Sequence, residues 1–362
     1  MSDEQTFGAP KSYVAPTFRS ASGEPPPLRL HLNENTGGCS PAVLAAIRAI
    51  ETDEIACYPD YADITAAVER FLDVDAGWVQ LTNGLDEGLH VVAQAAATRA
   101  GRSSRPRSAV IVEPAFEMYA ICAAAAGLDV VRIPPRDGFV FPLDALLAEA
   151  ALDAGLFYLT DPNNPTGLAI PPGAIEQLCA AAPDAIVLVD EAYVEFSGRT
   201  SLPSLPRFRN LVIGRTFAKA HGLAGLRAGA LVAHAETLAP LRRILPPFTL
   251  NVCAMRGLQA ALQDPAFVAW SVSQARASKA LIYEWCDGRG FTYWPSEANF
   301  VLLRVGAAAP AIVRALAERG VLVRDRSDQP GCDGCIRITA GPIEHTRTCL
   351  AELEAVLASR PD

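Results

Sequence analysis

The sequence lacks three features that would place it in large classes of proteins. It has no uncharged apolar run near the ~20 residues that a membrane-spanning helix needs. Its 31 basic residues are outnumbered by 40 acidic ones, so it has no basic excess with which to neutralise nucleic-acid phosphates. Its first ten residues, MSDEQTFGAP, contain no apolar segment of a secretory signal. These absences predict a soluble, cytoplasmic protein with neither a nucleic-acid nor a membrane partner.

The nine cysteines do not form the pattern of a disulfide framework or a clustered metal site. They are odd in number and widely spread, which is typical of reduced thiols. Only Cys332 and Cys335 have the spacing of a metal or redox pair. A zinc site would need a second pair or nearby histidines, so we expect two ordinary thiols in a turn and no bound metal.

Lysine is scarce, and this makes one lysine informative. The only three are Lys11, Lys219 and Lys279. Lys11 lies in an irregular N-terminal arm and Lys279 lies in a predicted helix, so we expect both to be exposed. Lys219 follows a predicted strand, and an amine can lose its proton where a guanidinium cannot. Because lysine amines form Schiff bases with carbonyl compounds, Lys219 is a candidate nucleophile.

Short apolar runs alternate with helical patterns between residues 78 and 235, which predicts an α/β fold. Most of these runs are continuous, as expected for parallel strands that are buried on both faces. We predict a large domain whose mainly parallel, seven-stranded sheet lies between helices, followed by a smaller α+β C-terminal domain. The predicted boundaries are an arm over 1–40, the large domain over 41–245 and the small domain over 246–362. The seven predicted strands are 78–81, 109–112, 130–133, 156–160, 185–189, 211–213 and 230–232.

Residues with chemical potential follow several of these strands, where α/β sheets bind their ligands. The turn at Thr82–Glu87 opens a helix and could hold a phosphate through backbone N–H groups, although such turns are common. The segment Asp161–Gly167 holds two asparagines in a frame of prolines, or forms a simple Asx-turn. Asp190 is costly to bury unless it meets a cation, or it is a solvated strand terminus.

Together these segments resemble the fold-type I pyridoxal-phosphate (PLP) enzymes, specifically the class I/II aminotransferases, and within them most closely the histidinol-phosphate aminotransferases. The resemblance runs from about Leu32 to the end of the chain. The matching motifs, in order, are Leu32–Asn35, Tyr58–Asp60, Gly84–Glu87, Pro114–Tyr119, Asn163–Gly167, Asp190–Tyr193, Lys219 with Arg227, Ser296–Phe300, Arg324–Asp325 and Arg337–Thr339.

The resemblance implies a catalytic role for Lys219, Asp190 and Tyr193. Lys219 would hold PLP as a Schiff base and act as general base and acid, and Asp190 would pair with the protonated ring nitrogen. Tyr193 would donate to the ring oxygen. The other implied cofactor-binding residues are Asn164 at the ring oxygen, Phe116 on the ring face, and Gly84, Leu85, Asp86 and Arg227 at the phosphate.

The resemblance also implies the partners of the enzyme. Tyr58 would reach the cofactor phosphate of a neighbouring subunit, which implies a homodimer with shared active sites. Arg337 would bind a substrate carboxylate and Arg324 a substrate phosphate, with Asn35 and Tyr13 as further substrate contacts. The implied reaction transfers an amino group between histidinol phosphate and 2-oxoglutarate, giving imidazole acetol phosphate and glutamate.

Three departures from the family pattern leave the substrate open. Ala218 stands where a phosphate-binding serine is usual, Phe116 replaces the common tyrosine, and Thr36 stands where the N-terminal motif usually has glutamate. The alternatives are an aromatic amino-acid aminotransferase and a PLP lyase that resembles threonine-phosphate decarboxylase. A non-catalytic binding protein of this fold is a third alternative, against which the joint presence of Lys219, Asp190 and Arg227 argues.

Overall fold

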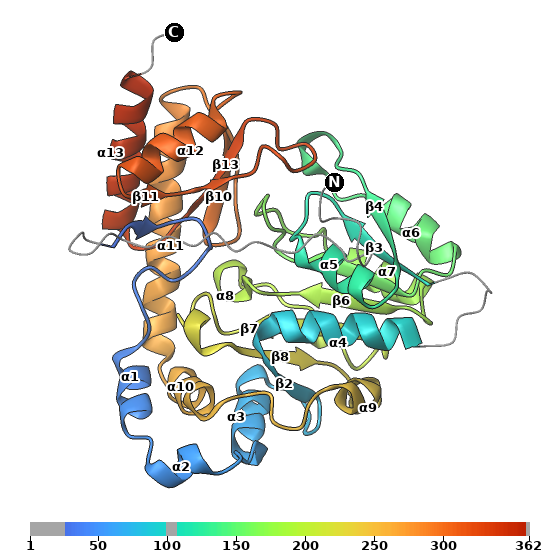
Figure 1. The fold of residues 1–362 in the computed structure, drawn as a ribbon. Helices are drawn as coiled ribbons and strands as arrows, with labels where there is room; N and C mark the ends of the chain where they lie inside the picture. Colours follow the sequence, from blue (N-terminus) through green and yellow to red (C-terminus); the bar gives the residue numbers. More distant parts are fainter. Residues whose placement is uncertain (1–25, 99–106, 360–362) are drawn as a thin grey trace, which may run out of the picture.

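The computed structural model describes residues 26–98 and 107–359, and a seven-stranded sheet forms the centre of the larger part of the molecule (Figure 1). Its strands lie in the order β2-β8-β7-β6-β5-β3-β4. They are β2 (Val79–Asn83), β3 (Ser108–Val112), β4 (Asp129–Ile133), β5 (Leu156–Thr160), β6 (Ile186–Asp190), β7 (Leu211–Thr216) and β8 (Ala228–Val232). Each of the seven predicted apolar runs contributes one strand.

The sheet is mainly parallel, as predicted. Strand β8 is antiparallel to both of its neighbours, β2 and β7, and the remaining pairs are parallel. The fold-class prediction is therefore confirmed, with β8 as the single reversed strand. Its direction was not readable from the sequence, because a strand buried on both faces has the same apolar pattern in either orientation.

Both faces of the sheet are covered by helices, which explains the continuous apolar runs. In β6, Ile186 and Leu188 pack into the core on one face, whereas Val187 and Val189 pack into the core on the other. The first face is covered by α4 (Gly84–Thr98), α5 (Met118–Ala125) and α9 (Ala235–Ile244). The second is covered by α1 (Pro41–Arg48), α3 (Ala62–Leu72), α6 (Leu143–Ala151), α7 (Ala174–Ala181) and α10 (Val252–Leu262).

The C-terminal part forms a separate α+β layer, also as predicted. A four-stranded antiparallel sheet has the order β12-β13-β10-β9. Its strands are β9 (Thr292–Trp294), β10 (Phe300–Arg304), β12 (Arg324–Asp325) and β13 (Cys335–Thr339), and its helices are α11 (Pro265–Asp287), α12 (Ala309–Glu318) and α13 (Ile343–Ala358). The long helix α11 runs from beside α1 and α10 to this layer (Figure 1).

The N-terminal segment connects the two parts of the molecule. Strand β1 (Leu28–Arg29) pairs in parallel with β11 (Val321–Leu322) of the C-terminal part, and the chain then crosses to the large sheet. Helix α1 begins as predicted, because the Ser40 side chain accepts a hydrogen bond from the Ala42 N–H and Pro41 occupies the first turn. The short helix α2 (Thr52–Ala56) was not predicted. The domain boundaries remain predictions.

Two further sequence predictions concern individual features. Lys279 is not freely exposed, because its Nζ lies in α11 and donates to the Ser296 carbonyl oxygen, and burial lowers its pKa to about 8. That expectation was wrong because the β9–β10 connection covers this face of the helix. Cys332 and Cys335 are buried against Leu302. Over the ranges that the structure describes, no helix has the length and apolarity needed to cross a bilayer.

Candidate active site

The carboxyl ends of the parallel strands border a cavity of about 500 Å³ that the C-terminal part closes from the other side. This is the edge at which open α/β sheets bind ligands, and the volume lies within the usual range for small-molecule sites. Nine of the predicted site residues line it: Leu85, Asp86, Phe116, Asn164, Asp190, Tyr193, Lys219, Arg227 and Arg337.

Lys219 lies in the turn after β7, with its amine inside the cavity. Its Nζ donates to the Leu32 carbonyl oxygen at 3.2 Å and lies 5.9 Å from the centre of the Tyr193 ring. Burial, reinforced by the charge of Arg337, lowers the pKa of Lys219 to about 8. Because that value is close to neutrality, the amine is present in both protonated and neutral forms under ordinary conditions.

Asp190 ends β6 and is held by two neutral donors. Its Oδ2 accepts a hydrogen bond from Tyr119 Oη at 2.7 Å, and its Oδ1 accepts one from the Ala192 N–H at 2.9 Å. Tyr119 Oη also lies 2.7 Å from Thr160 Oγ1. Burial raises the pKa of Asp190 to about 6, and the bond from Tyr119 opposes that rise. The carboxylate is thus hydrogen-bonded by neutral groups, and the charge of Lys219 acts on it without a hydrogen bond between them.

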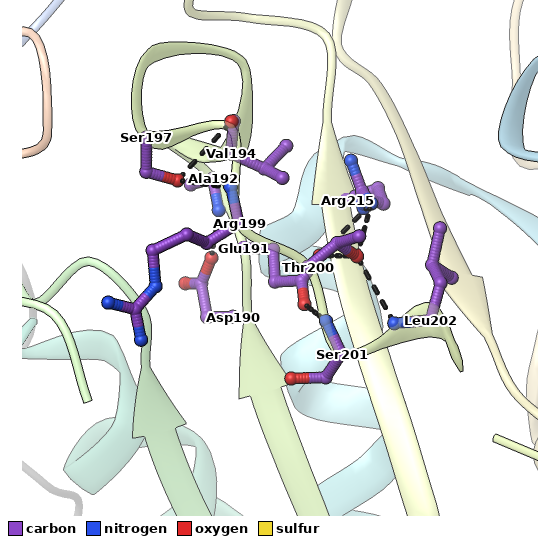
Figure 2. A network of polar contacts seen from close by, with 10 residues as sticks. All are labelled: Asp190, Glu191, Ala192, Val194, Ser197, Arg199, Thr200, Ser201, Leu202 and Arg215. Atoms are coloured by element: carbon purple, nitrogen blue, oxygen red, sulfur yellow. Dashed lines mark hydrogen bonds and ion pairs between the residues drawn. The ribbon is translucent and has the colours of Figure 1, made fainter. Parts of the chain in front are cut away.

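A buried ion pair fixes the chain just beyond Asp190 (Figure 2). Arg215 Nη2 lies 3.0 Å from Glu191 Oε2, and both side chains are almost completely buried. Thr200 lies between them: its hydroxyl donates to Glu191 and accepts from Arg215. The Ser201 N–H donates to the second Glu191 oxygen. These contacts join β6, β7 and the loop after α8 (Val194–Ser197), so the turn that carries Asp190 and Tyr193 has little freedom to move.

The N-terminal segment contributes directly to the cavity through Asn33. Asn33 Nδ2 donates to Tyr193 Oη at 2.9 Å, while its backbone N–H donates to Thr339 Oγ1. Its φ of 55° is in the left-handed region that asparagine tolerates better than most residues. Because Tyr193 Oη already accepts from Asn33, its own proton is free to donate into the cavity.

Asn164 and Arg337 connect the two parts of the molecule across the cavity. Arg337, from β13, donates through Nη1 to Asn164 Oδ1 and through Nη2 to the His31 carbonyl oxygen at 2.7 Å. Its guanidinium lies 5.2 Å from the centre of the Phe300 ring. Burial, reinforced by the neighbouring charges of Arg326 and Arg324, lowers the pKa of Arg337 to about 9.

At the other end of the cavity, Gly84 and Arg227 form a narrow cradle. Gly84 opens α4 with a φ of 73°, and its N–H donates to the Arg227 carbonyl oxygen at 2.8 Å. Arg227 Nη2 donates to Asp86 at 2.7 Å. A Cβ at residue 84 would lie 2.3 Å from Arg227 Nη2, so only glycine leaves room for the arginine. The helix N-terminus and the guanidinium together favour an anion here.

Several predicted site residues lie away from the cavity wall. Gly84 does not itself line the cavity, although Leu85, Asp86 and Arg227 around it do. Asn35 donates to the Ala220 carbonyl oxygen and the Ser271 hydroxyl instead, and Arg324 lies 4.0 Å from Glu117. Tyr58 is 80% exposed and stacks on Phe248 with ring centres 4.3 Å apart. Tyr13 lies outside the residues that the structure describes.

Several cavity residues were not predicted as site residues, and the polar ones among them include Asn33, Tyr119, Thr216 and Arg326. Asn33 and Tyr119 belong to the motifs Leu32–Asn35 and Pro114–Tyr119. These motifs pointed to the segments, but nothing in them identified these two side chains as site residues. Thr216 lies two residues before Ala218 and accepts its N–H at 3.2 Å. Arg326 follows Arg324 by two residues, and nothing in the spacing distinguished the two.

The comparisons with known proteins agree with this arrangement. The family model for aminotransferases of class I and II matches residues 25–353. Histidinol-phosphate aminotransferase 2 from Ralstonia nicotianae is 36% identical over 362 residues, covering 97% of this chain and 94% of that protein. Histidinol-phosphate aminotransferase from Halalkalibacterium halodurans is 32% identical over 338 residues, covering 91% of this chain and 89% of that protein.

A solved structure shares the fold over nearly the whole chain. It is the histidinol-phosphate aminotransferase from Sinorhizobium meliloti in complex with pyridoxal-5'-phosphate, which matches with a TM-score of 0.81 at 27% identity. The match covers 91% of this chain and 90% of that one. With the family model and the two relatives, it establishes that this chain belongs to the aminotransferases of class I and II.

Proposed function

We propose that this chain is a PLP-dependent aminotransferase that transfers an amino group between histidinol phosphate and 2-oxoglutarate. One observation supports this reaction class: Lys219, an amine whose pKa is lowered to about 8, lines the same cavity as the buried acid Asp190 and the guanidinium of Arg337. The proposed substrate is supported by the names of relatives that match almost the whole chain at 36% and 32% identity.

The residues of the cavity fit PLP. Asp190 is a buried carboxylate whose hydrogen bonds come only from neutral donors, and a protonated ring nitrogen would supply a cation in direct contact with it. Phe116 borders the same space with a flat apolar ring. Lys219 offers the only amine among the described residues that line it. When bound, PLP supplies an aldehyde and an electron-withdrawing ring.

The cradle at Gly84 and Arg227 fits the cofactor phosphate. The first N–H groups of α4 and the Arg227 guanidinium converge there, and Leu85 and Asp86 lie at the same helix start. Ala218 offers no hydroxyl, but the Thr216 hydroxyl lines the cavity and keeps its proton free after it accepts the Ala218 N–H. We infer that Thr216 replaces part of the contact that the alanine lacks.

The proton chemistry falls to Lys219, Tyr193 and Asn164. A Lys219 pKa of about 8 lets the amine accept and return a proton at near-neutral pH, as a general base and acid must. Tyr193 donates from a hydroxyl that Asn33 holds in place. The Asn164 side-chain oxygen accepts a hydrogen bond from Arg337, so the NH₂ group of the same amide points away from the arginine. Each donor is therefore oriented before a substrate enters.

Arg337 is the proposed carboxylate-binding residue. Its fork is buried at the cavity wall, and its Nε has no acceptor among the described residues. A carboxylate would satisfy a guanidinium of this kind with charge-assisted bonds. Arg324, Asn35 and Tyr13 remain proposed substrate contacts from the family resemblance, although Arg324 and Asn35 do not line the cavity of a single chain. The cytoplasmic location remains a prediction from the sequence.

We also propose a homodimer in which Tyr58 serves the site of the other subunit. Tyr58 and Phe248 form an exposed, stacked aromatic pair, and Ile55, three residues before Tyr58, is 69% exposed. Large exposed apolar side chains of this kind mark association surfaces. Light scattering after gel filtration should give about twice the mass of one chain, and Tyr58→Ala should weaken retention of PLP.

The reaction is tested by offering single amino donors to the PLP-loaded protein. Histidinol phosphate and glutamate should each change the cofactor absorbance as they transfer their amino group, and a Lys219→Ala variant should not turn over. A response to phenylalanine but not to histidinol phosphate would assign the chain to the aromatic aminotransferases. Carbon dioxide release from threonine phosphate would assign it to the lyases.

A further inference from the structure

Three arginines of the C-terminal part and one carboxylate of the large sheet's side form a charged cluster, and two of the arginines, Arg326 and Arg337, line the cavity. Arg324 and Arg337 are register partners on β12 and β13, and Arg326 follows β12 directly. Glu117, from the turn between β3 and α5, is the acid that pairs with them: it lies 2.7 Å from Arg326 and 4.0 Å from Arg324. The cluster therefore carries a formal excess of two positive charges, three from the arginines less one from Glu117.

Arg326 is the member of this cluster that was not anticipated and that reaches the cavity. It lines the cavity beside Arg337, whereas Arg324 does not. The Arg326 side chain is only 5% exposed. Its Nη1 donates to Glu117, but its Nε is buried and has no acceptor among the described residues. The guanidinium thus keeps unused donors in a place from which most water is excluded.

The backbone around Arg326 is fixed, so the side chain is directed rather than free. The Arg326 N–H donates to the Cys335 carbonyl oxygen, and its own carbonyl oxygen accepts from the Gln329 N–H, both at 3.0 Å. The Gln329 side chain donates to the Ala115 carbonyl oxygen and to Glu117 Oε1. These bonds fasten the loop after β12 to the turn that carries Phe116. Arg326 is therefore placed on a rigid support.

The two excess positive charges of the cluster favour binding of an anion that carries more than one negative charge. Removing guanidinium groups from water costs free energy unless anionic partners replace the water. Arg337 donates only to neutral acceptors, Asn164 and a carbonyl oxygen. The other two arginines share the single carboxylate of Glu117. A phosphomonoester carries close to two negative charges at neutral pH and presents three acceptor oxygens.

We propose that Arg326 is a specificity-determining residue that binds the phosphomonoester group of the amino substrate, with Glu117 as the positioning residue that holds it. Arg326 selects phosphorylated amino donors over neutral aromatic ones of similar length. The cofactor phosphate would be held elsewhere, by the proposed cradle of Gly84 and Arg227 at the start of α4. This inference rests on the proposed aminotransferase function and adds a residue that decides its substrate.

The test compares Arg326→Gln with wild type in half-reactions of the PLP-loaded protein. We expect kcat/KM for histidinol phosphate to fall by about 10- to 100-fold, because a charge-assisted hydrogen-bond pair is lost, with the change in KM rather than kcat. The value for phenylalanine should change by less than about threefold. Arg347→Gln, which removes the same charge from an exposed pair on α13, should leave both values unchanged. Equal losses for the two donors in Arg326→Gln would overturn the proposal.

A binding measurement separates this inference from the proposed function. Inorganic phosphate should bind the PLP-loaded wild type, and calorimetry should find that binding weakened about tenfold or more in Arg326→Gln. If wild type transfers no amino group but shows this difference, the proposed function fails and the anion site stands. If histidinol phosphate reacts and phosphate binds equally well in both proteins, the function stands and Arg326 is not its specificity residue.

Folding of the variant is controlled by a second substitution. Arg326→Lys keeps the charge and the partner Glu117 but loses the planar fork. It should retain the PLP absorbance and show a KM for histidinol phosphate between those of wild type and Arg326→Gln. If Arg326→Gln does not fold, Arg326→Lys with a wild-type KM for histidinol phosphate would by itself refute the role of the fork.

Discussion

The hydrogen bond from Tyr119 to Asp190 gives the sharpest prediction about the cofactor site. Tyr119→Phe removes a 2.7 Å bond to a buried carboxylate and leaves the ring in place. A hydrogen bond to a charged group contributes about 1.5–3 kcal/mol. Since one pKa unit corresponds to about 1.4 kcal/mol, the pKa of Asp190, already raised to about 6, should rise by about one to two units.

The consequence is weaker cofactor binding at neutral pH. A protonated Asp190 cannot pair with a protonated ring nitrogen. When its pKa rises from about 6 to about 7–8, the ionised fraction at pH 7 falls from about nine-tenths to between about one-half and one-tenth, so the variant should bind PLP about 2- to 10-fold more weakly. Titration of the apoprotein with PLP, followed by absorbance, measures this affinity. Near-ultraviolet circular dichroism of the same samples checks that the aromatic core is intact.

Tyr158→Phe is the matched control. Tyr158 is equally buried, stacks on Tyr119 with ring centres 4.9 Å apart, and donates its hydroxyl to the Leu89 carbonyl oxygen. Tyr158→Phe loses a hydroxyl at the same depth without touching Asp190. Its PLP affinity should stay within about 1.5-fold of wild type, since its lost bond is to a neutral acceptor away from the cofactor. If the two variants bind PLP equally well, the reasoning about Asp190 is refuted.

Three further predictions concern charge and backbone. Because the pKa of Lys219 is lowered to about 8, the fraction of neutral amine increases as pH rises. The rate at which apoprotein captures PLP should therefore grow about tenfold from pH 7 to pH 9. Stopped-flow absorbance measures this rate, and a rate that does not change with pH would contradict the prediction. Arg215→Met should lower the free energy of unfolding by about 3–5 kcal/mol in urea titrations, because it leaves Glu191 buried without its cation; a loss below about 1 kcal/mol would exclude a structural role for the pair. Gly84→Ala should cost about 1–2 kcal/mol from its left-handed backbone alone and also weaken PLP binding, because the new Cβ displaces Arg227; unchanged PLP affinity would argue against the cradle.

Much of the large sheet could be predicted because two sequence features indicate its strands. Most strands are continuous apolar runs, and several are followed by ionisable residues that are costly to bury in a core, such as Asp190 and Lys219. Parallel strands bring these residues to one edge, so spacing along the chain became proximity in space. The direction of β8 left no such mark.

The parts of the site that could not be predicted depend on geometry that no short pattern encodes. Tyr119 reaches Asp190 only because α5 presents that face to β6. Arg324 and Arg326 differ in their access to the cavity because β12 ends at Asp325 and the loop then turns toward Glu117. Tyr58 was assigned through a neighbouring subunit, and a single chain leaves it exposed.

The contribution of the N-terminal segment has a consequence for synthesis of the protein. Arg337 donates to the His31 carbonyl oxygen and Asn33 donates to Thr339, and each bond joins residues 306 positions apart. A ribosome adds about 5–20 residues per second, so the first segment waits about 15–60 s for its partners. Lys219 and Asp190 emerge long before that strand exists. A nascent chain therefore cannot complete its catalytic cavity, or begin turnover, until β13 has been synthesised.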